Sequence, residues 1–230
     1  MAYDVINKIK RGWVHLRLQP VRVFCFHHVS KEYDADSMNP TDWMQLDEFK
    51  NKVLSMQRNG VKFISLTDAH RHICKDIFRW QKYAVLTFDD GYMSLNEILP
   101  WMEEQHIPAT LFINGKYLDG KSYRSNPHEK YLINAELFAL TSRLIEIGSH
   151  GWEHTNAREM NLDEFKLGIE LNIERLHTHP RYIPFHAYTW GKHTSETDRY
   201  LSSKDIIPVC MDGKKNYNDS TVVHRELIDK

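Results

Sequence analysis

Two neighbouring carboxylates at the end of an apolar run are the first feature of this sequence that suggests chemistry. Asp89 and Asp90 follow the run AVLTF at residues 84–88, and Gly91 comes directly after them. Adjacent anions repel each other, so a divalent cation bound to one carboxylate would stabilise the pair and leave the other free to act as a base. The alternative interpretation is an ordinary turn, because Asp and Gly are common turn residues.

Two histidines supply the further ligands that such a cation needs. His150 and His154 are four positions apart in EIGSHGWEHTN, residues 146–156, so one helical turn or a tight loop can point both imidazoles the same way. Two imidazoles and one carboxylate leave positions for water and substrate, which is typical of a catalytic metal site. Taken alone, the histidine spacing also fits a solvated helix face, but the two signals together favour a metal site.

Strand-like and helix-like stretches alternate along the chain, as a mainly parallel α/β fold requires. Apolar runs predict strands at residues 21–26, 61–66, 82–88, 108–114, 182–188 and 206–210. Amphipathic patterns predict helices at residues 46–60, 95–105, 134–148 and 161–179. An open doubly wound sheet and a small β/α barrel both fit this order, and both place chemistry at the C-terminal ends of strands.

Length and composition indicate one domain of the α/β class. The chain has 230 residues, enough to bury a sizeable core without cross-links. Lys and Arg number 30 against 31 Asp and Glu, so the net charge of -1 gives no reason to expect a nucleic-acid partner. Cys25, Cys74 and Cys210 are far apart and form no CxxC pair, which argues against a disulfide framework and against a cysteine-built zinc site.

Residues 1–20 form an N-terminal segment ahead of the main domain at 21–230. An apolar stripe at helical spacing within residues 5–16 lies beside several basic residues, a pattern that suits an amphipathic helix on an anionic membrane. Packing of the segment against the main domain is the alternative. The segment lacks the apolar core of a signal peptide, and no run approaches the roughly 18 apolar residues of a membrane span. We therefore expect a cytoplasmic protein, with peripheral contact to the inner face of the membrane left open.

The two motifs resemble those of a known family. LTFDDGY and SHGWEHTN resemble the first and second motifs of the polysaccharide deacetylases, carbohydrate esterases that share the chitooligosaccharide deacetylase homology domain. FHHVS at residues 26–30, and the helix and strand that follow it, resemble the lead-in of that family. The resemblance covers roughly residues 21–210 and implies a distorted (β/α) barrel with about seven parallel strands, in the general class of parallel barrels.

The resemblance also implies roles for individual residues. It makes Asp89 the catalytic base, and it makes Asp90, His150 and His154 the ligands of one divalent metal ion, most often zinc, with cobalt or nickel as alternatives. In the family a late leucine-x-histidine motif supplies the general acid, and His224 is the only late histidine of this chain.

Two further histidines, His27 and His186, are other candidates for the acid or for substrate contact; each also fits the ordinary role of a packed histidine at a strand end. Trp152 lies inside the histidine motif and is therefore expected near the site. The family's Asp-Trp motif, which orients the acid, is not evident.

A third motif departs from the family pattern. FHAYTWG at residues 185–191 resembles a segment that often reads FAYPYG, with Thr189 in place of the proline and Trp190 in place of the tyrosine. In the family a backbone N–H of this segment helps to hold the oxyanion, a role that survives a change of side chain if the loop keeps its shape. Trp190 is either a core residue or a wall on which a sugar stacks.

The expected function is that of a metal-dependent N-deacetylase acting on an N-acetylated sugar in a polysaccharide, an oligosaccharide or a glycan precursor. One alternative is a hydrolase of a non-sugar amide on the same scaffold. Another is a sugar-binding homologue without activity, which the altered third motif and the missing late motifs suggest. The polar stretch at residues 115–131 is expected to form part of the substrate wall.

Overall fold

A computed structural model describes residues 19–75, 80–217 and 221–228. The predicted amphipathic stripe at residues 5–16 lies outside these ranges, so the N-terminal helix and its membrane contact stay predictions. Among the described residues, none of the helices combines the length and the apolar character that crossing a membrane requires.

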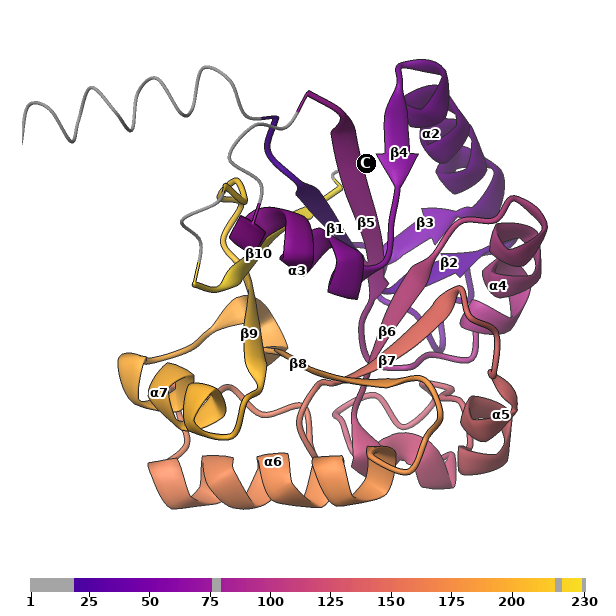
Figure 1. The fold of residues 1–230 in the computed structure, drawn as a ribbon. Coiled ribbons are helices and arrows are strands. Elements are labelled where there is room, and N and C mark those ends of the chain that lie inside the picture. The colour runs from indigo at the N-terminus through magenta and orange to yellow at the C-terminus, as the bar shows by residue number, and fades with distance from the viewer. Residues whose placement is uncertain (1–18, 76–79, 218–220, 229–230) are drawn as a thin grey trace, which may run out of the picture.

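Parallel strands close into a barrel at the centre of the molecule (Figure 1). In order around the ring they are β1 (Arg22–Phe26), β10 (Val223–Leu227), β9 (Ile207–Met211), β8 (Tyr182–Ala187), β7 (Ile145–Ser149), β6 (Ala109–Ile113) and β5 (Lys82–Phe88). The pairing of β1 with β5 closes the ring. The short strand β4 (Val61–Phe63) pairs with the first half of β5 and β6 with its second half. The structure thus confirms the predicted distorted (β/α) barrel of about seven parallel strands.

Helices and short elements surround the barrel (Figure 1). The helices are α2 (Leu46–Arg58), α3 (Leu66–Lys75), α4 (Leu95–Glu104), α5 (Asn134–Ala139), α6 (Leu162–Leu176) and α7 (Ser195–Ser203). The short elements are the strand pair β2 (His28–Ser30) and β3 (Trp43–Gln45) and the 3-10 turns η1 (Gly115–Asp119) and η2 (Thr189–Gly191).

The alternation of side chains along β5 explains its continuous apolar run. Leu86 and Phe88 pack in a cluster with residues of α2 and α4 outside the barrel. Val85 belongs to the cluster inside the barrel, which also contains Leu66 and Ile73 of α3. Since both faces of the strand are covered, both must be apolar. The same alternation turns the residues that follow β5 toward the inside of the barrel at its C-terminal end.

One predicted element is wrong. The helix expected at residues 134–148 ends at Ala139, and the residues from Ile145 to Ser149 form the buried strand β7 between β6 and β8. The apolar residues of LIEIG fit a helix by spacing, but the fully buried position between two strands makes the short run a strand. As a result, His150 follows the C-terminal end of a strand and does not lie on a helix.

Candidate active site

A tight turn at the end of β5 separates the two carboxylates. The backbone N–H of Asp89 donates to the carbonyl of Phe26 on β1 at 2.9 Å. Asp90 and Gly91 follow with φ of 71° and 75°, the left-handed region that favours glycine. A Cβ on Gly91 would lie 2.9 Å from Cδ1 of Ile113 on β6, a side-chain end that can shift, so it is the positive φ that favours glycine here. The turn places both carboxylates in the buried interior of this barrel end.

Asp89 forms a two-pronged ion pair with Arg225 of β10. The Nη1 and Nη2 atoms of the arginine lie 2.6 and 2.8 Å from the two carboxylate oxygens, and both side chains are buried. Burial raises the pKa of the Asp89 carboxyl, but the Arg225 charge outweighs it and, with His150, holds the pKa at about 2. Asp89 is therefore ionised at neutral pH. Arg225 was not predicted from the sequence, because an isolated arginine near the C-terminus carries no motif.

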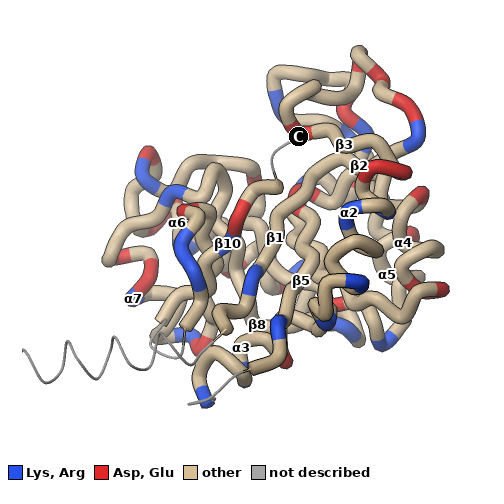
Figure 2. The backbone as a smooth tube through the Cα atoms, turned by 90° about the horizontal axis from the view of Figure 1, so that it is seen from above, with Lys and Arg blue, Asp and Glu red and all other residues tan. Residues whose placement is uncertain are grey.

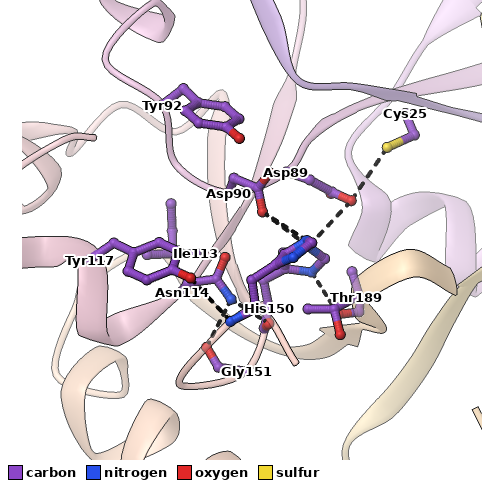
Figure 3. Close-up of polar contacts among 12 residues, drawn as sticks. Cys25, Asp89, Asp90, Tyr92, Ile113, Asn114, Tyr117, His150, Gly151 and Thr189 are labelled. Carbon is purple, nitrogen blue, oxygen red and sulfur yellow. Dashed lines mark hydrogen bonds and ion pairs between the residues drawn. The ribbon is translucent and has the colours of Figure 1, made fainter. Parts of the chain in front are cut away.

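Asp90, His150 and His154 converge on one point, as predicted. The Nε2 atoms of both histidines lie 3.4 Å from Oδ1 of Asp90, and the ligand atoms of all three residues lie within 4.8 Å of one another. Figure 3 shows Asp89, Asp90 and His150 pointing toward one another. Asp90 comes from the turn after β5, and His150 and His154 come from the loop after β7.

The donor set fits a divalent metal ion. Tetrahedral zinc with bonds of about 2.1 Å places neighbouring donors about 3.4 Å apart, the spacing found here. Nδ1 of His150 donates to the carbonyl of Ala187 at 2.8 Å, so the lone pair of its Nε2 faces Asp90. Oδ1 of Asp90 is buried and has no hydrogen bond of acceptable angle among the described residues, although Nη2 of Arg124 lies 2.6 Å from it. Nitrogen and oxygen donors of this kind suit zinc, cobalt and nickel.

Burial keeps both imidazoles in the form that binds metals. It lowers the pKa of His150, and it lowers the pKa of His154 to about 3, against the opposing effect of the nearby aspartates. Neutral imidazole is the state that ligates a metal ion. The loop that carries the histidines is fixed from outside, because the side-chain amide of Asn114 donates to the carbonyls of His150 and Gly151 at 2.7 and 3.3 Å.

Arg124 lies against Asp90 and comes from the polar loop at residues 115–131. Its Nη2 is 2.6 Å from Oδ1 of Asp90, and its Nη1 donates to the hydroxyl of Tyr92 at 2.6 Å. The guanidinium also lies over the rings of Tyr92 and Tyr117. Burial favours the neutral acid at Asp90, but the Arg124 charge outweighs it and keeps the pKa far below the usual range. The sequence predicted a role for the loop at residues 115–131 but did not indicate Arg124 in particular.

The three candidate histidines for proton donation lie in different places. His27 is half-buried, and its ligand atom lies within 4.8 Å of Cys25 Sγ and an oxygen of Asp89. His186 is buried and neutral, because burial lowers its pKa to about 3, and its Nδ1 lies 3.1 Å from the hydroxyl of Ser149. His224 contacts Asp212 at 3.0 Å. It precedes Arg225 on β10, so the two side chains point to opposite faces and His224 faces away from Asp89.

The two candidate tryptophans also lie in different places. Trp190 is 66 % exposed, which rules out the core-packing alternative, and its ring lies 5.1 Å from the ring of His154. Its φ of 58° makes the third motif a sharp turn, held where the buried Thr189 hydroxyl donates to the carbonyl of Thr155. Trp152 packs against Gly115 and lines a cavity of about 540 Å³ that His150 and Thr189 also line. Of the two candidate tryptophans, Trp190 thus lies at the rim of the cluster of Asp90, His150 and His154.

Basic and acidic residues are interspersed along the part of the chain that the structure describes. Figure 2 shows Lys and Arg interspersed with Asp and Glu over most elements. A nucleic-acid surface is expected to gather basic residues on one face, and the described part of the chain does not have that pattern in this view.

A family model described as polysaccharide deacetylase matches residues 79–206. The match contains Asp89, Asp90, His150 and His154. Two curated relatives, the poly-beta-1,6-N-acetyl-D-glucosamine N-deacetylases of Escherichia coli K12 and O157:H7, are each 29% identical to this chain over 111 residues. The aligned part is 44% of this chain and only 16% of each relative, so the chain corresponds to a small part of those proteins.

Solved structures with low sequence identity share the fold. IcaB from Ammonifex degensii has a TM-score of 0.76 at 19% identity and covers 92% of this chain and 94% of its own. The Streptococcus pyogenes deacetylase PplD, solved in complex with acetate, has a TM-score of 0.75 at 16% identity and covers 91% and 92%. A de-N-acetylase from Aggregatibacter actinomycetemcomitans has a TM-score of 0.71 at 18% identity and covers 92% and 95%.

Proposed function

Since this chain belongs to the polysaccharide deacetylase family, we propose that it is a metal-dependent N-deacetylase that hydrolyses the acetamide of an N-acetylated sugar. Its main support is the convergence of Asp90 Oδ1, His150 Nε2 and His154 Nε2 beside the ionised Asp89. The curated relatives are named for deacetylation of a poly-N-acetylglucosamine, which favours an N-acetylated glycan as substrate. The complete set of four residues speaks against a sugar-binding homologue without activity.

Asp90, His150 and His154 would hold one divalent ion, with zinc as the first choice and cobalt or nickel as alternatives. When bound, the ion supplies a Lewis acid for the acetamide carbonyl and makes a water molecule acidic enough to attack near neutral pH. Because Asp90 and both histidines are buried or nearly so, the site excludes most solvent and strengthens the electrostatic interactions within it.

Asp89 is suited to accept the proton of the attacking water. It is ionised, and Arg225 fixes the orientation of its carboxylate through both oxygens. The thiol of Cys25 also lies 3.4 Å from Oδ2, so little rotation is available to the base. A base held within hydrogen-bond reach of the water gains rate mainly through its position.

His27 is the best placed of the histidines to protonate the leaving amine. It lies beside Asp89, and it is half-buried, so its ring is accessible from solvent. Neither His224 nor His186 combines these properties, since the first faces away and the second is buried and neutral. The turn at Trp190 offers backbone near the cluster for the oxyanion, and the exposed indole offers a flat surface on which a sugar ring can stack.

Acetate release from a substrate panel tests the proposal. The panel contains β-1,6-linked and β-1,4-linked N-acetylglucosamine oligosaccharides, N-acetylated nucleotide sugars and small non-sugar acetamides. We expect release from one of the sugar classes, its loss after treatment with a chelator, and its return when zinc or cobalt is added. Release from the non-sugar acetamides alone would replace the proposal with an amidase on the same scaffold.

A further inference from the structure

We propose that Cys210, Asp212 and His224 form a second metal site, on the outer face of the barrel, that takes Zn²⁺ or a similar borderline cation. The three residues lie at the end of β9 and the start of β10. They are not part of the cluster of Asp89, Asp90, His150 and His154, so the inference goes beyond the proposed function.

Strand pairing brings together residues that are far apart in sequence. β9 and β10 are parallel neighbours, and Cys210 is the register partner of His224. Register partners in a sheet point to the same face. Asp212 follows the end of β9 and folds back toward them. The spacing of the cysteines does not predict this arrangement, because the thiol's partners are a histidine on the neighbouring strand and an aspartate that follows β9.

The donor atoms of the three side chains meet at one point. Nδ1 of His224 lies 3.0 and 3.1 Å from the two oxygens of Asp212 and 3.4 Å from Sγ of Cys210. All three ligand atoms lie within 4.8 Å of one another. Tetrahedral zinc places such donors about 3.4–3.6 Å apart, so the distances from His224 Nδ1 to the thiol and to the carboxylate already lie within about half an ångström of those an ion requires.

The same geometry excludes a nucleophilic triad. In a Cys-His-Asp relay the thiol contacts one ring nitrogen and the carboxylate contacts the other. Here both contact Nδ1 of His224. Burial also raises the pKa of the Cys210 thiol to about 12, so an activated thiolate is not present without a metal. Binding of a divalent ion would release the thiol proton to solvent and leave the thiolate as a ligand.

The site is held in place and remains accessible. The side-chain amide of the buried Asn216 donates to the carbonyl of His224 at 2.7 Å and accepts from its N–H at 2.8 Å. Cys210 is fully buried, whereas the side chains of His224 and Asp212 are 16 % and 24 % exposed, so an ion can enter from the aspartate side. Lys214 pairs with Asp212 at 2.9 Å, but its side chain is 70 % exposed and can move away.

A metal ion here would have a structural role. It would join the end of β9 to the start of β10, next to Arg225, the residue that orients Asp89. One thiolate, one imidazole and one carboxylate, with water as a fourth ligand, form a set that suits zinc and cobalt.

Titration of the purified chain with Co²⁺ tests the site, because a cobalt-bound thiolate has a charge-transfer absorption in the near ultraviolet. The cluster of Asp90, His150 and His154 contains no sulfur and cannot produce this band. We expect the band in the parent and in Cys74→Ser and Cys25→Ser, and its loss in Cys210→Ser. Absence of the band from the parent, or its loss in Cys25→Ser instead, would overturn the proposal.

Zinc content gives an independent readout. We expect two zinc ions per chain in the parent and one in Cys210→Ser, with unchanged circular dichroism to show that the variant folds. Asp212→Asn is a milder variant. Loss of an outer-shell partner alone weakens metal binding about 10–100-fold, so loss of this ligand should weaken the second ion by at least about tenfold. In His150→Gln we expect loss of the other ion with the cobalt band intact. This result separates the second site from the catalytic one. A single zinc ion in the parent that is retained in Cys210→Ser would contradict the second site, whereas a single ion that is lost in Cys210→Ser would keep the second site and contradict the metal at Asp90, His150 and His154.

Discussion

At the scale of single residues, the structure explains how two adjacent carboxylates can be buried together. Each carboxylate has its own cation, Arg225 for Asp89 and Arg124 for Asp90. The repulsion that first suggested a metal is therefore already balanced by two arginines from distant parts of the chain. The support for a metal comes instead from the spacing of the three ligand atoms and from the tautomer of His150.

Replacement of Arg225 by methionine should destabilise the protein by about 3–5 kcal/mol, because it leaves the buried Asp89 charge without a partner. The free energy of unfolding, from denaturant titration, is the quantity to measure. Arg22→Met is a matched control on the neighbouring strand, since Arg22 forms an ion pair with Glu226 in a largely exposed position. That control should cost less than about 1 kcal/mol. Equal losses in the two variants would contradict the buried pair.

Replacement of Arg124 by glutamine should strengthen metal binding. The guanidinium lies 2.6 Å from the Asp90 oxygen that faces both histidines, so its charge opposes a divalent cation there. We expect the dissociation constant for zinc to fall by about tenfold or more, equivalent to roughly 1.4 kcal/mol. Competition with a chromogenic chelator measures it, with Lys121→Gln in the same loop as control. An unchanged or weaker affinity would show that Arg124 supports the metal site.

At the scale of elements, the strands that sequence reasoning found are those with apolar runs. β5 has the predicted bounds, β1 and β8 differ from prediction by one residue at one end, and β6 and β9 by one residue at each end. The strand predicted at residues 61–66 ends earlier, as β4 (Val61–Phe63). β7 and β10 were missed because they contain charged residues whose partners come from other parts of the fold. The carboxylate of Glu146 accepts from the N–H of Leu66 and the hydroxyl of Thr110, and Arg225 pairs with Asp89. A local pattern does not contain such distant partners.

His186 on β8 should make the stability of the protein depend on pH. Burial lowers its pKa from 6.5 to about 3, so below about pH 6.5 the unfolded chain binds a proton that the folded chain does not. Stability should therefore fall as the pH falls, by about 1.4 kcal/mol per pH unit from this residue. Unfolding of the parent and of His186→Asn between pH 7 and 5 should show a shallower dependence in the variant. Parallel curves would contradict the burial of a neutral imidazole.

At the scale of the whole molecule, the candidate active site and helix α3 occupy different parts of the barrel. α3 packs against the interior cluster, and the candidate active site lies at the C-terminal ends of the strands. The family match at residues 79–206 contains the four motif residues but does not include the ring strands β1, β9 and β10. Those three strands complete the barrel, and β1 and β10 bring the Cys25–His27 stretch and Arg225 to Asp89. The motifs predicted which residues gather at this end of the barrel, whereas only the closed barrel shows what holds Asp89 in place.

Acetate release by metal-loaded parent and Asp89→Asn, with metal content measured in both, tests the central claim most directly. The substrate is the N-acetylated oligosaccharide that the panel identifies. We expect the parent to release acetate, and we expect Asp89→Asn to keep the metal while losing activity by about 100-fold or more, since a positioned base contributes roughly 10²–10⁴-fold. An Asp89→Asn protein that keeps both its metal and the parent's rate would contradict the assignment of Asp89 as the base.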